Sequence, residues 1–182
     1  TNISKDEFNE RVDYLGAYLS FSSGGAYGAS LKKYFPEILE LMADGVKNSQ
    51  FTQEEFEKEQ KITLDGIKSN EKSVTSAARR VENALTYGKE HPFGEFITKE
   101  TVKNSTLKDV ENRYKNYYKP NNAYLIIIGD INPKKIKKMV KKLFSDWKSG
   151  SIPEYTMPKV NNVETTEIDF INMDNAVQSE IA

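Results

Sequence analysis

The chain has 182 residues, and 26 lysines and arginines nearly balance 27 aspartates and glutamates, which leaves a formal net charge of -1. This balance excludes a strong long-range attraction to nucleic acid or to an anionic membrane surface. His91 is the only histidine and cysteine is absent, so a cysteine nucleophile is excluded and a zinc site or triad has one imidazole to use. The longest apolar run, 123–128, has the length of a strand, far below the roughly 20 residues of a transmembrane helix.

The N-terminal segment predicts a helix followed by a hairpin. Ser4 and Glu7 form an S-x-x-E capping box, and Gly16 is placed to end the helix. Residues 17–22 alternate between apolar and polar side chains, which is typical of a half-buried strand. Two glycines then form a turn, so we expect residues 26–31 to pair back on this strand.

The central segment is predicted to be helical. Pro36 opens a helix with a wide apolar face. Thr52 caps a second helix that the apolar stripe extends to about Tyr87, with a kink expected near Gly66 or at residues 69–70. The stripe is interrupted only by a glutamate at position 71, for which an ion pair with Arg79, Arg80 or a lysine elsewhere is the expected role.

The last third mixes helices and strands. A helix capped by Thr106 precedes an apolar strand at 123–128, which we expect in the centre of a covered sheet. Asn132 caps a final helix with an apolar stripe on one side and lysines on the other, interpreted as a solvated face. A second strand is expected at 167–171. The segregation of helices and strands predicts an α+β fold, with helices packed on one face of a mostly antiparallel sheet.

Six phrases, in order, resemble the M16 family of zinc metallopeptidases, which includes insulin-degrading enzyme, pitrilysin, mitochondrial processing peptidase and the bc1 core subunits. They lie at residues 8–17, 35–44, 56–60, 91–94, 114–124 and 125–130. The resemblance implies an M16-like domain at 1–148 that lacks its N-terminal strands and motif helix, and then a linker at 149–162. Residues 163–182, with a family-like phrase at 175–179, would form the first strand region of a following M16-like domain.

The resemblance also implies that the zinc site is degenerate. The family's H-x-x-E-H motif would lie before Thr1, and its third ligand is the second Glu of an E-x6-E pattern. Glu59 matches the first Glu, but Gly66 stands at the ligand position. Asp65 is one residue away, which is about 100° of helix rotation. We therefore expect no catalytic or metal-ligating residue and no cofactor in this chain, with zinc only in a catalytic partner.

The function implied is that of a non-catalytic M16 homologue. It would pair with a zinc-bearing M16 subunit or second half, enclose unfolded peptides and help to degrade or process them. Leu19, Ser20 and Phe21 match the family strand that binds substrate by β-augmentation, although a purely structural edge strand is the alternative. His91 is expected to anchor its loop.

Two alternatives stay open. One is an active zinc metalloendopeptidase whose H-x-x-E-H motif lies upstream, and the other is a structural subunit of a larger complex. No nucleic-acid partner and no transmembrane segment are expected. The sequence leaves the compartment open, with a bacterial periplasm or cell envelope as the favoured setting.

Overall fold

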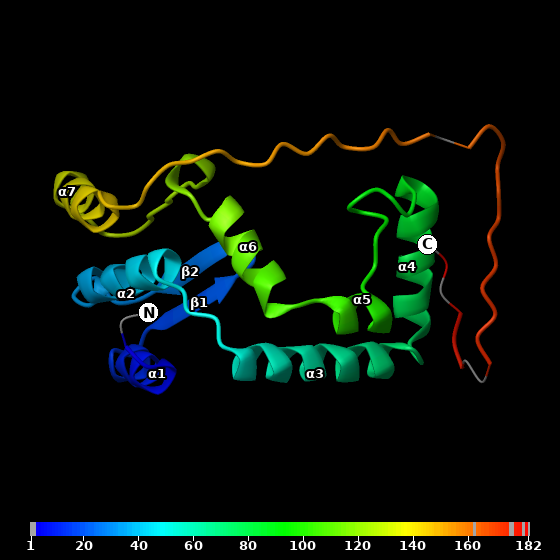
Figure 1. Cartoon of the computed structure of the whole chain (residues 1–182), viewed down its shortest axis with the longest axis horizontal. Coiled ribbons are helices and arrows are strands. Elements are labelled where there is room, and N and C mark those ends of the chain that lie inside the picture. The colour runs from blue at the N-terminus through cyan, green and yellow to red at the C-terminus, as the bar shows by residue number, and fades with distance from the viewer. Residues whose placement is uncertain (1–2, 162, 175–176, 180, 182) are drawn as a thin grey trace. The chain divides into compact units, whose positions relative to one another are not determined.

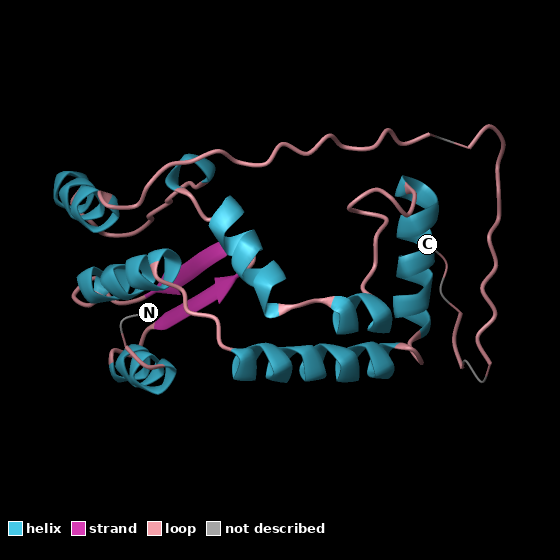
Figure 2. Ribbon diagram, viewed as in Figure 1, coloured by secondary structure: helices cyan, strands magenta, loops and turns pink. Residues whose placement is uncertain are grey.

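The computed structural model describes residues 3–161, 163–174, 177–179 and 181 (Figure 1). The elements are α1 (Lys5–Tyr14), β1 (Tyr18–Ser22), β2 (Gly25–Ala29), α2 (Phe35–Lys47), α3 (Gln53–Asn70), α4 (Val74–Tyr87), α5 (Lys99–Asn104), α6 (Leu107–Tyr117), the 3-10 turn η1 (Pro120–Asn122) and α7 (Pro133–Phe144). The fold is α+β, rich in helices, and the described residues form one small antiparallel sheet (Figure 2). Among the residues described, no helix combines the length and apolarity that a membrane span requires.

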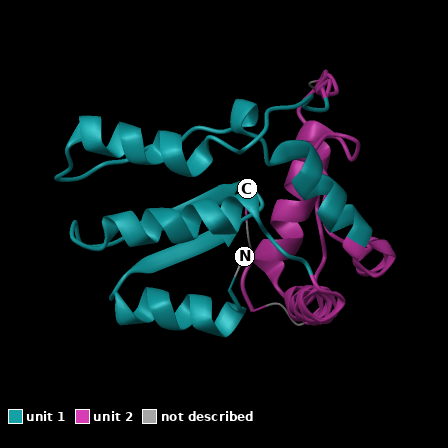
Figure 3. Ribbon diagram, turned by 60° about the vertical axis from the view of Figure 1, so that its left-hand side comes forward, with its two compact units in different colours: residues 1–51, 108–153 teal, residues 52–107, 154–182 magenta. Residues whose placement is uncertain are grey.

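The chain divides into two compact units (Figure 3). Unit 1 comprises Thr1–Phe51 and Lys108–Pro153, and unit 2 comprises Thr52–Leu107 and Glu154–Ala182. Each unit is therefore built from two separate stretches of sequence.

The core of unit 1 is formed by α1, the hairpin and α2. The cap expected at Ser4 is confirmed, because its hydroxyl accepts a hydrogen bond of 3.2 Å from the backbone N–H of Glu7. Gly16 has a φ of +57°, a left-handed conformation that suits glycine and turns the chain from α1 into β1. The buried cluster consists of Phe8, Val12, Leu15, Ile38 and Leu41.

Two glycines allow α2 to lie close to the hairpin. A Cβ atom at Gly28 of β2 would lie 3.0 Å from Cε of Met42, and one at Gly45 of α2 would lie 2.6 Å from Cε1 of Phe21. Glycine is a poor strand former, but here the missing side chain makes room for the helix. The hairpin is confirmed, with Leu19 opposite Gly28 in its register.

Unit 2 corrects the prediction of one helix from Thr52 to Tyr87. The helix ends at Asn70, and α4 begins after Ser73, whose hydroxyl accepts a hydrogen bond of 3.2 Å from the N–H of Ser76. The break therefore follows residues 69–70, and Gly66 stays inside α3. The apolar stripe continues through the break, which is why periodicity alone predicts a single helix.

The short helix α5 was not predicted. Thr98 and Thr101 form a reciprocal capping box, in which each side chain accepts a hydrogen bond from the other residue's backbone N–H. This arrangement uses threonine where the usual box has Glu or Gln, so the sequence signature is weak.

The two strands expected in the last third are not formed. Tyr124, Ile126 and Ile128 are exposed by 97%, 79% and 92%, and no backbone hydrogen bond in the described part of the chain involves 123–128. The central, covered position predicted for this segment is therefore wrong for the described residues. Apolar character indicates that a strand should be covered, but a strand forms only where a partner strand supplies the hydrogen bonds.

Further along, residues 167–171 are also unpaired, and Ile168 is 93% exposed. The described residues of the predicted linker, 149–161, contain neither helix nor strand. Residues 175 and 176 of the family-like phrase at 175–179 lie outside the described residues.

Candidate functional site

The candidate peptide-binding strand is β1, and its side chains divide between the two faces of the hairpin. Leu19 is half-buried and packs on the core cluster. The Phe21 ring lies 5.9 Å from the ring of Phe8 and against Gly45. Ser20 faces the other way, opposite Tyr27 in the register. The Leu19 side chain is thus held by the core, whereas the Phe21 side chain contacts the core but is still 41% exposed.

The backbone of β1, unlike the Leu19 side chain, has hydrogen-bonding groups on the side away from β2. Ser22 and Gly25 flank a two-residue turn, so they form a hydrogen-bonded pair, and such pairs recur at every second residue of an antiparallel ladder. The N–H and C=O groups of Leu19 and Phe21 consequently point away from β2. Within the described residues the sheet has two strands, so this edge of β1 has no strand partner. An extended peptide can add to such an edge.

The outer face of the hairpin is aromatic. The rings of Tyr18 and Tyr27 lie 5.9 Å apart and are 58% and 65% exposed. Side chains of this kind can contact alternate residues of a peptide that pairs with β1. Tyr18 and Tyr27 are diagonal neighbours across the two strands, because Tyr27 lies opposite Ser20 in the register. The sequence predicts this register only if the position of the turn is known.

The α3 positions that would support zinc are exposed. Glu59 and Gly66 are seven residues apart, about two helical turns, and so lie on nearly the same face. A Cβ atom at Gly66 would meet nothing within 4 Å. A longer side chain would therefore fit at this position, but the glycine itself provides no donor atom.

Zinc sites in proteins use several Cys, His or carboxylate ligands, and the residues present do not supply such a set. Glu59 has no second donor on its face of α3 at position 66, and Asp65 lies about 100° away around the helix. In the portion that the structure describes, no group of three or more His, Cys, Asp and Glu residues is arranged to hold a metal ion. Glu59 and Gly66 by themselves therefore do not supply the ligand set that a zinc site needs.

His91 anchors its loop, as predicted. Its ring is buried, with 6% of the residue exposed, and stacks on Tyr87 at 5.3 Å. Nδ1 accepts a hydrogen bond of 3.1 Å from the N–H of Phe93, and the backbone carbonyl accepts from the N–H groups of Gly94 and Glu95. A nitrogen occupied by its own loop is not available to a metal.

The ion pair expected for Glu71 is formed with Lys99 rather than with an arginine. Nζ of Lys99 lies 2.5 Å from Oε1 of Glu71. The hydrogen bond from Lys99 is the main reason that the pKa of the Glu71 carboxyl lies below its usual value. This pair fastens the start of α5 to the end of α3 within unit 2.

Unit 1 also contains an open apolar cavity of about 680 Å³ that the sequence does not reveal. It is lined by parts of the hairpin turn, α2, α6, the segment after α6 and α7, including Ala26, Val46, Tyr118, Leu125, Phe144 and Trp147. The Tyr118 hydroxyl donates a hydrogen bond to the carbonyl of Ser22, and burial raises the pKa of this phenol. Such a cavity can take apolar side chains. Its walls come from distant segments, so no local signal predicts it.

Comparison with known proteins finds similarity to a peptidase family model and to proteins described as zinc proteases. Residues 104–182 match the family model described as "Peptidase M16 inactive domain". The chain is 26% identical over 147 residues to an uncharacterised zinc protease of Rickettsia felis, covering 80% of this chain and 35% of that protein. It is 25% identical over 181 residues to the zinc protease PqqE of Helicobacter pylori, covering 92% of this chain and 40% of that protein.

Two further matches extend the comparison. Cytochrome b-c1 complex subunit 1 of Bos taurus is 23% identical over 162 residues, covering 88% of this chain and 33% of that protein. The crystal structure of a protease from Helicobacter pylori shares the fold, with a TM-score of 0.71 and 22% identity, over 88% of this chain and 40% of that chain. The chain thus spans about a third to two-fifths of the length of these proteins. The matched family model, the sequence relatives and the shared fold all support membership of the M16 family of metallopeptidases.

Proposed function

We propose that this chain is a non-catalytic M16 segment that works beside a zinc-bearing M16 subunit or half, and that together they enclose peptides for degradation or processing. The observation that carries the proposal is Gly66. It lies two turns after Glu59 on nearly the same face of α3 and has no donor atom. The resemblance assigns this position to the family's third zinc ligand. Zinc is expected in the partner and not in this chain.

The hairpin supports a role in holding peptide. The outward N–H and C=O groups of Leu19 and Phe21 form an edge to which an extended chain can add, whatever its sequence. Backbone recognition suits a protein that must accept many unfolded peptides. Tyr18 and Tyr27 supply exposed aromatic surface beside this edge.

Zinc content tests the proposal most directly. The full-length protein, purified alone and dialysed against zinc, is compared with a Gly66→Glu variant and a matched Gly66→Gln control by metal analysis and by cleavage of an unstructured peptide. We expect the unsubstituted protein to hold far less than one zinc per chain and to leave the peptide intact. Stoichiometric zinc together with cleavage by the unsubstituted protein alone would establish the active endopeptidase instead.

A structural subunit is the second candidate, favoured by the similarity to cytochrome b-c1 complex subunit 1. The two functions differ in what the assembled complex does. The protein is purified with its natural partner, and the complex is assayed for peptide cleavage with and without a chelator. Chelator-sensitive cleavage supports the peptidase partnership, whereas a stable complex without cleavage supports the structural role.

A further inference from the structure

The charges of α7 are segregated to an unusual degree. The helix carries six lysines and no acidic residue. At about 100° per residue, the lysines occupy an arc of about 160°, and the apolar residues occupy about 140° on the opposite side. The lysines are exposed and are here named the lysine face: Lys134, Lys135, Lys137, Lys138, Lys141 and Lys142.

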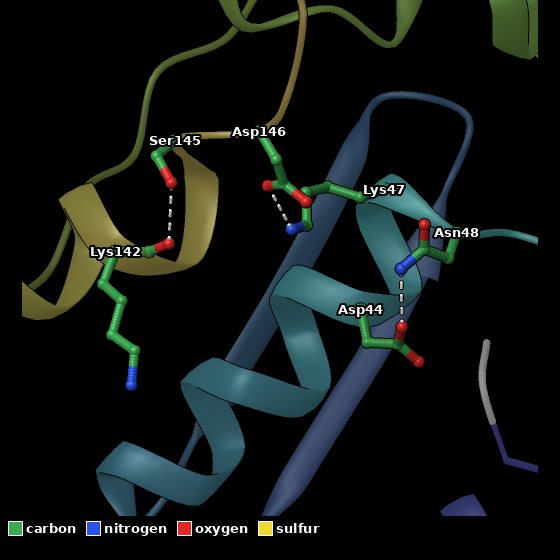
Figure 4. A network of polar contacts seen from close by, with 6 residues as sticks. All are labelled: Asp44, Lys47, Asn48, Lys142, Ser145 and Asp146. Atoms are coloured by element: carbon green, nitrogen blue, oxygen red, sulfur yellow. Dashed lines mark hydrogen bonds and ion pairs between the residues drawn. The ribbon is translucent and has the colours of Figure 1, made fainter.

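The acids nearest to this helix in sequence are already paired with other residues. Asp130, before the helix, lies 2.8 Å from Nζ of Lys32, and Asp146, after it, lies 2.6 Å from Nζ of Lys47. Figure 4 shows the Lys142 side chain directed away from Asp146. In the described part of the chain, no ion pair joins the lysine face to a carboxylate. Its positive charge is therefore left uncompensated.

Helix stability does not account for this pattern. Lys134 and Lys135 lie in the first turn, where the helix dipole favours acidic side chains and disfavours cations. The first turn contains no acid. The lysines in the first turn and the lack of an acid there both disfavour the helix. This suggests that the positive charge serves to bind a partner rather than to stabilise the fold.

The geometry narrows the class of partner. The lysine face is the convex side of a helix, and no residue of it lines the cavity of unit 1. It contains neither arginine nor an aromatic side chain, which base-stacking and bidentate phosphate contacts use. A dense row of mobile lysines is sufficient to bind the anionic headgroups of a bilayer. Clusters of four to eight basic residues on an amphipathic helix are typical of such binding.

We propose that the lysine face of α7 is a docking surface for an anionic phospholipid bilayer. The apolar side of α7 packs within unit 1 against α2, so the contact is electrostatic and does not require insertion. The net charge of -1 does not oppose it, because at physiological salt charges beyond about 8 Å are largely screened. The proposal is independent of peptide binding and of zinc.

Vesicle co-sedimentation of the full-length protein tests this surface. The probes are vesicles of phosphatidylcholine alone and vesicles that contain about three parts in ten of phosphatidylglycerol. The test variant replaces four lysines of the face with Gln, at Lys134, Lys138, Lys141 and Lys142. The matched control makes four Gln substitutions at exposed lysines of unit 2, at Lys58, Lys61, Lys68 and Lys72. Both variants change the net charge equally, and circular dichroism checks that both are folded.

We expect the unsubstituted protein and the control to bind the anionic vesicles and not the neutral ones. Since each lysine at such a surface contributes roughly fivefold in partitioning, the loss of four lysines should weaken vesicle binding of the α7 variant by about six-hundredfold. Raising the salt to about 0.5 M should release the bound protein.

Three outcomes would overturn the proposal. The first is equal binding to neutral and anionic vesicles, and the second is an equal loss in the α7 variant and the control. The third is tighter binding to polyglutamate or duplex DNA than to the anionic vesicles at the same salt, which would assign the face to an acidic macromolecule.

Discussion

Nζ of Lys47, at the end of α2, lies 2.6 Å from Oδ1 of Asp146, which follows α7, although the two residues are 99 positions apart. The Lys47 side chain is 15% exposed and that of Asp146 is 72% exposed. A second pair, between Lys32 and Asp130, spans the other end of α7. The two pairs thus lie on either side of α7 in the sequence, and the lysines of α7 itself are exposed.

The ion pair between Lys47 and Asp146 is expected to make the free energy of unfolding depend on pH in the acidic range. The hydrogen bond from Lys47 is the main cause that lowers the pKa of Asp146 below its usual 3.8. A carboxyl with a lowered folded-state pKa stabilises the fold above its unfolded pKa, and this stabilisation is lost as the pH falls through the folded value. We expect Asp146→Asn to lower the free energy of unfolding in urea at pH 7, and the difference to shrink below pH 3.8. A difference that is constant from pH 7 to pH 3 would contradict this.

Gly45 and Gly66 form a matched pair for testing the packing of α2. Both are helical glycines, and in an exposed helix Gly→Ala stabilises by about 1 kcal/mol. Gly66→Ala should show this gain, because its Cβ meets nothing within 4 Å. Gly45→Ala places a Cβ 2.6 Å from Cε1 of Phe21, and overpacking of this kind costs about 1–3 kcal/mol. Urea unfolding of both variants measures the difference, and equal gains would show that Phe21 moves aside freely.

Ser73 is predicted to keep α4 separate from α3. Its hydroxyl caps α4, so Ser73→Ala should cost about 1 kcal/mol and speed amide exchange in the first turn of α4. Ser69→Ala is the control, since Ser69 is an exposed residue inside α3 and Ala favours helix. If the two variants have the same stability, the cap does not contribute.

Leu19 is predicted to act through the core rather than through direct contact with peptide. Because it is half-buried against the core cluster, Leu19→Ala should lower the free energy of unfolding by about 1–2 kcal/mol. Ser20→Ala should change it by less than about 0.5 kcal/mol. Peptide affinity, measured by fluorescence anisotropy under conditions where both variants are folded, should be the same for the two. A loss of affinity confined to Leu19→Ala would assign its side chain to the binding site.

Features that depend on neighbours within a few positions were predictable from the sequence. The caps at Ser4 and Thr52 join residues three positions apart, and the hairpin turn spans two residues. Gly66 could be placed on α3 because the register of a helix follows from counting along the chain. Both partners of these interactions lie within a few positions of each other, so the local sequence is sufficient to predict them.

The tertiary structure alone decided everything that depends on a distant partner. It paired Lys47 with Asp146 and Glu71 with Lys99, turned Leu19 and Phe21 toward the core, and left 123–128 without a strand partner among the described residues. The physical reason is that apolarity and charge determine which groups need a partner, whereas the path of the chain through space determines which partner lies within reach.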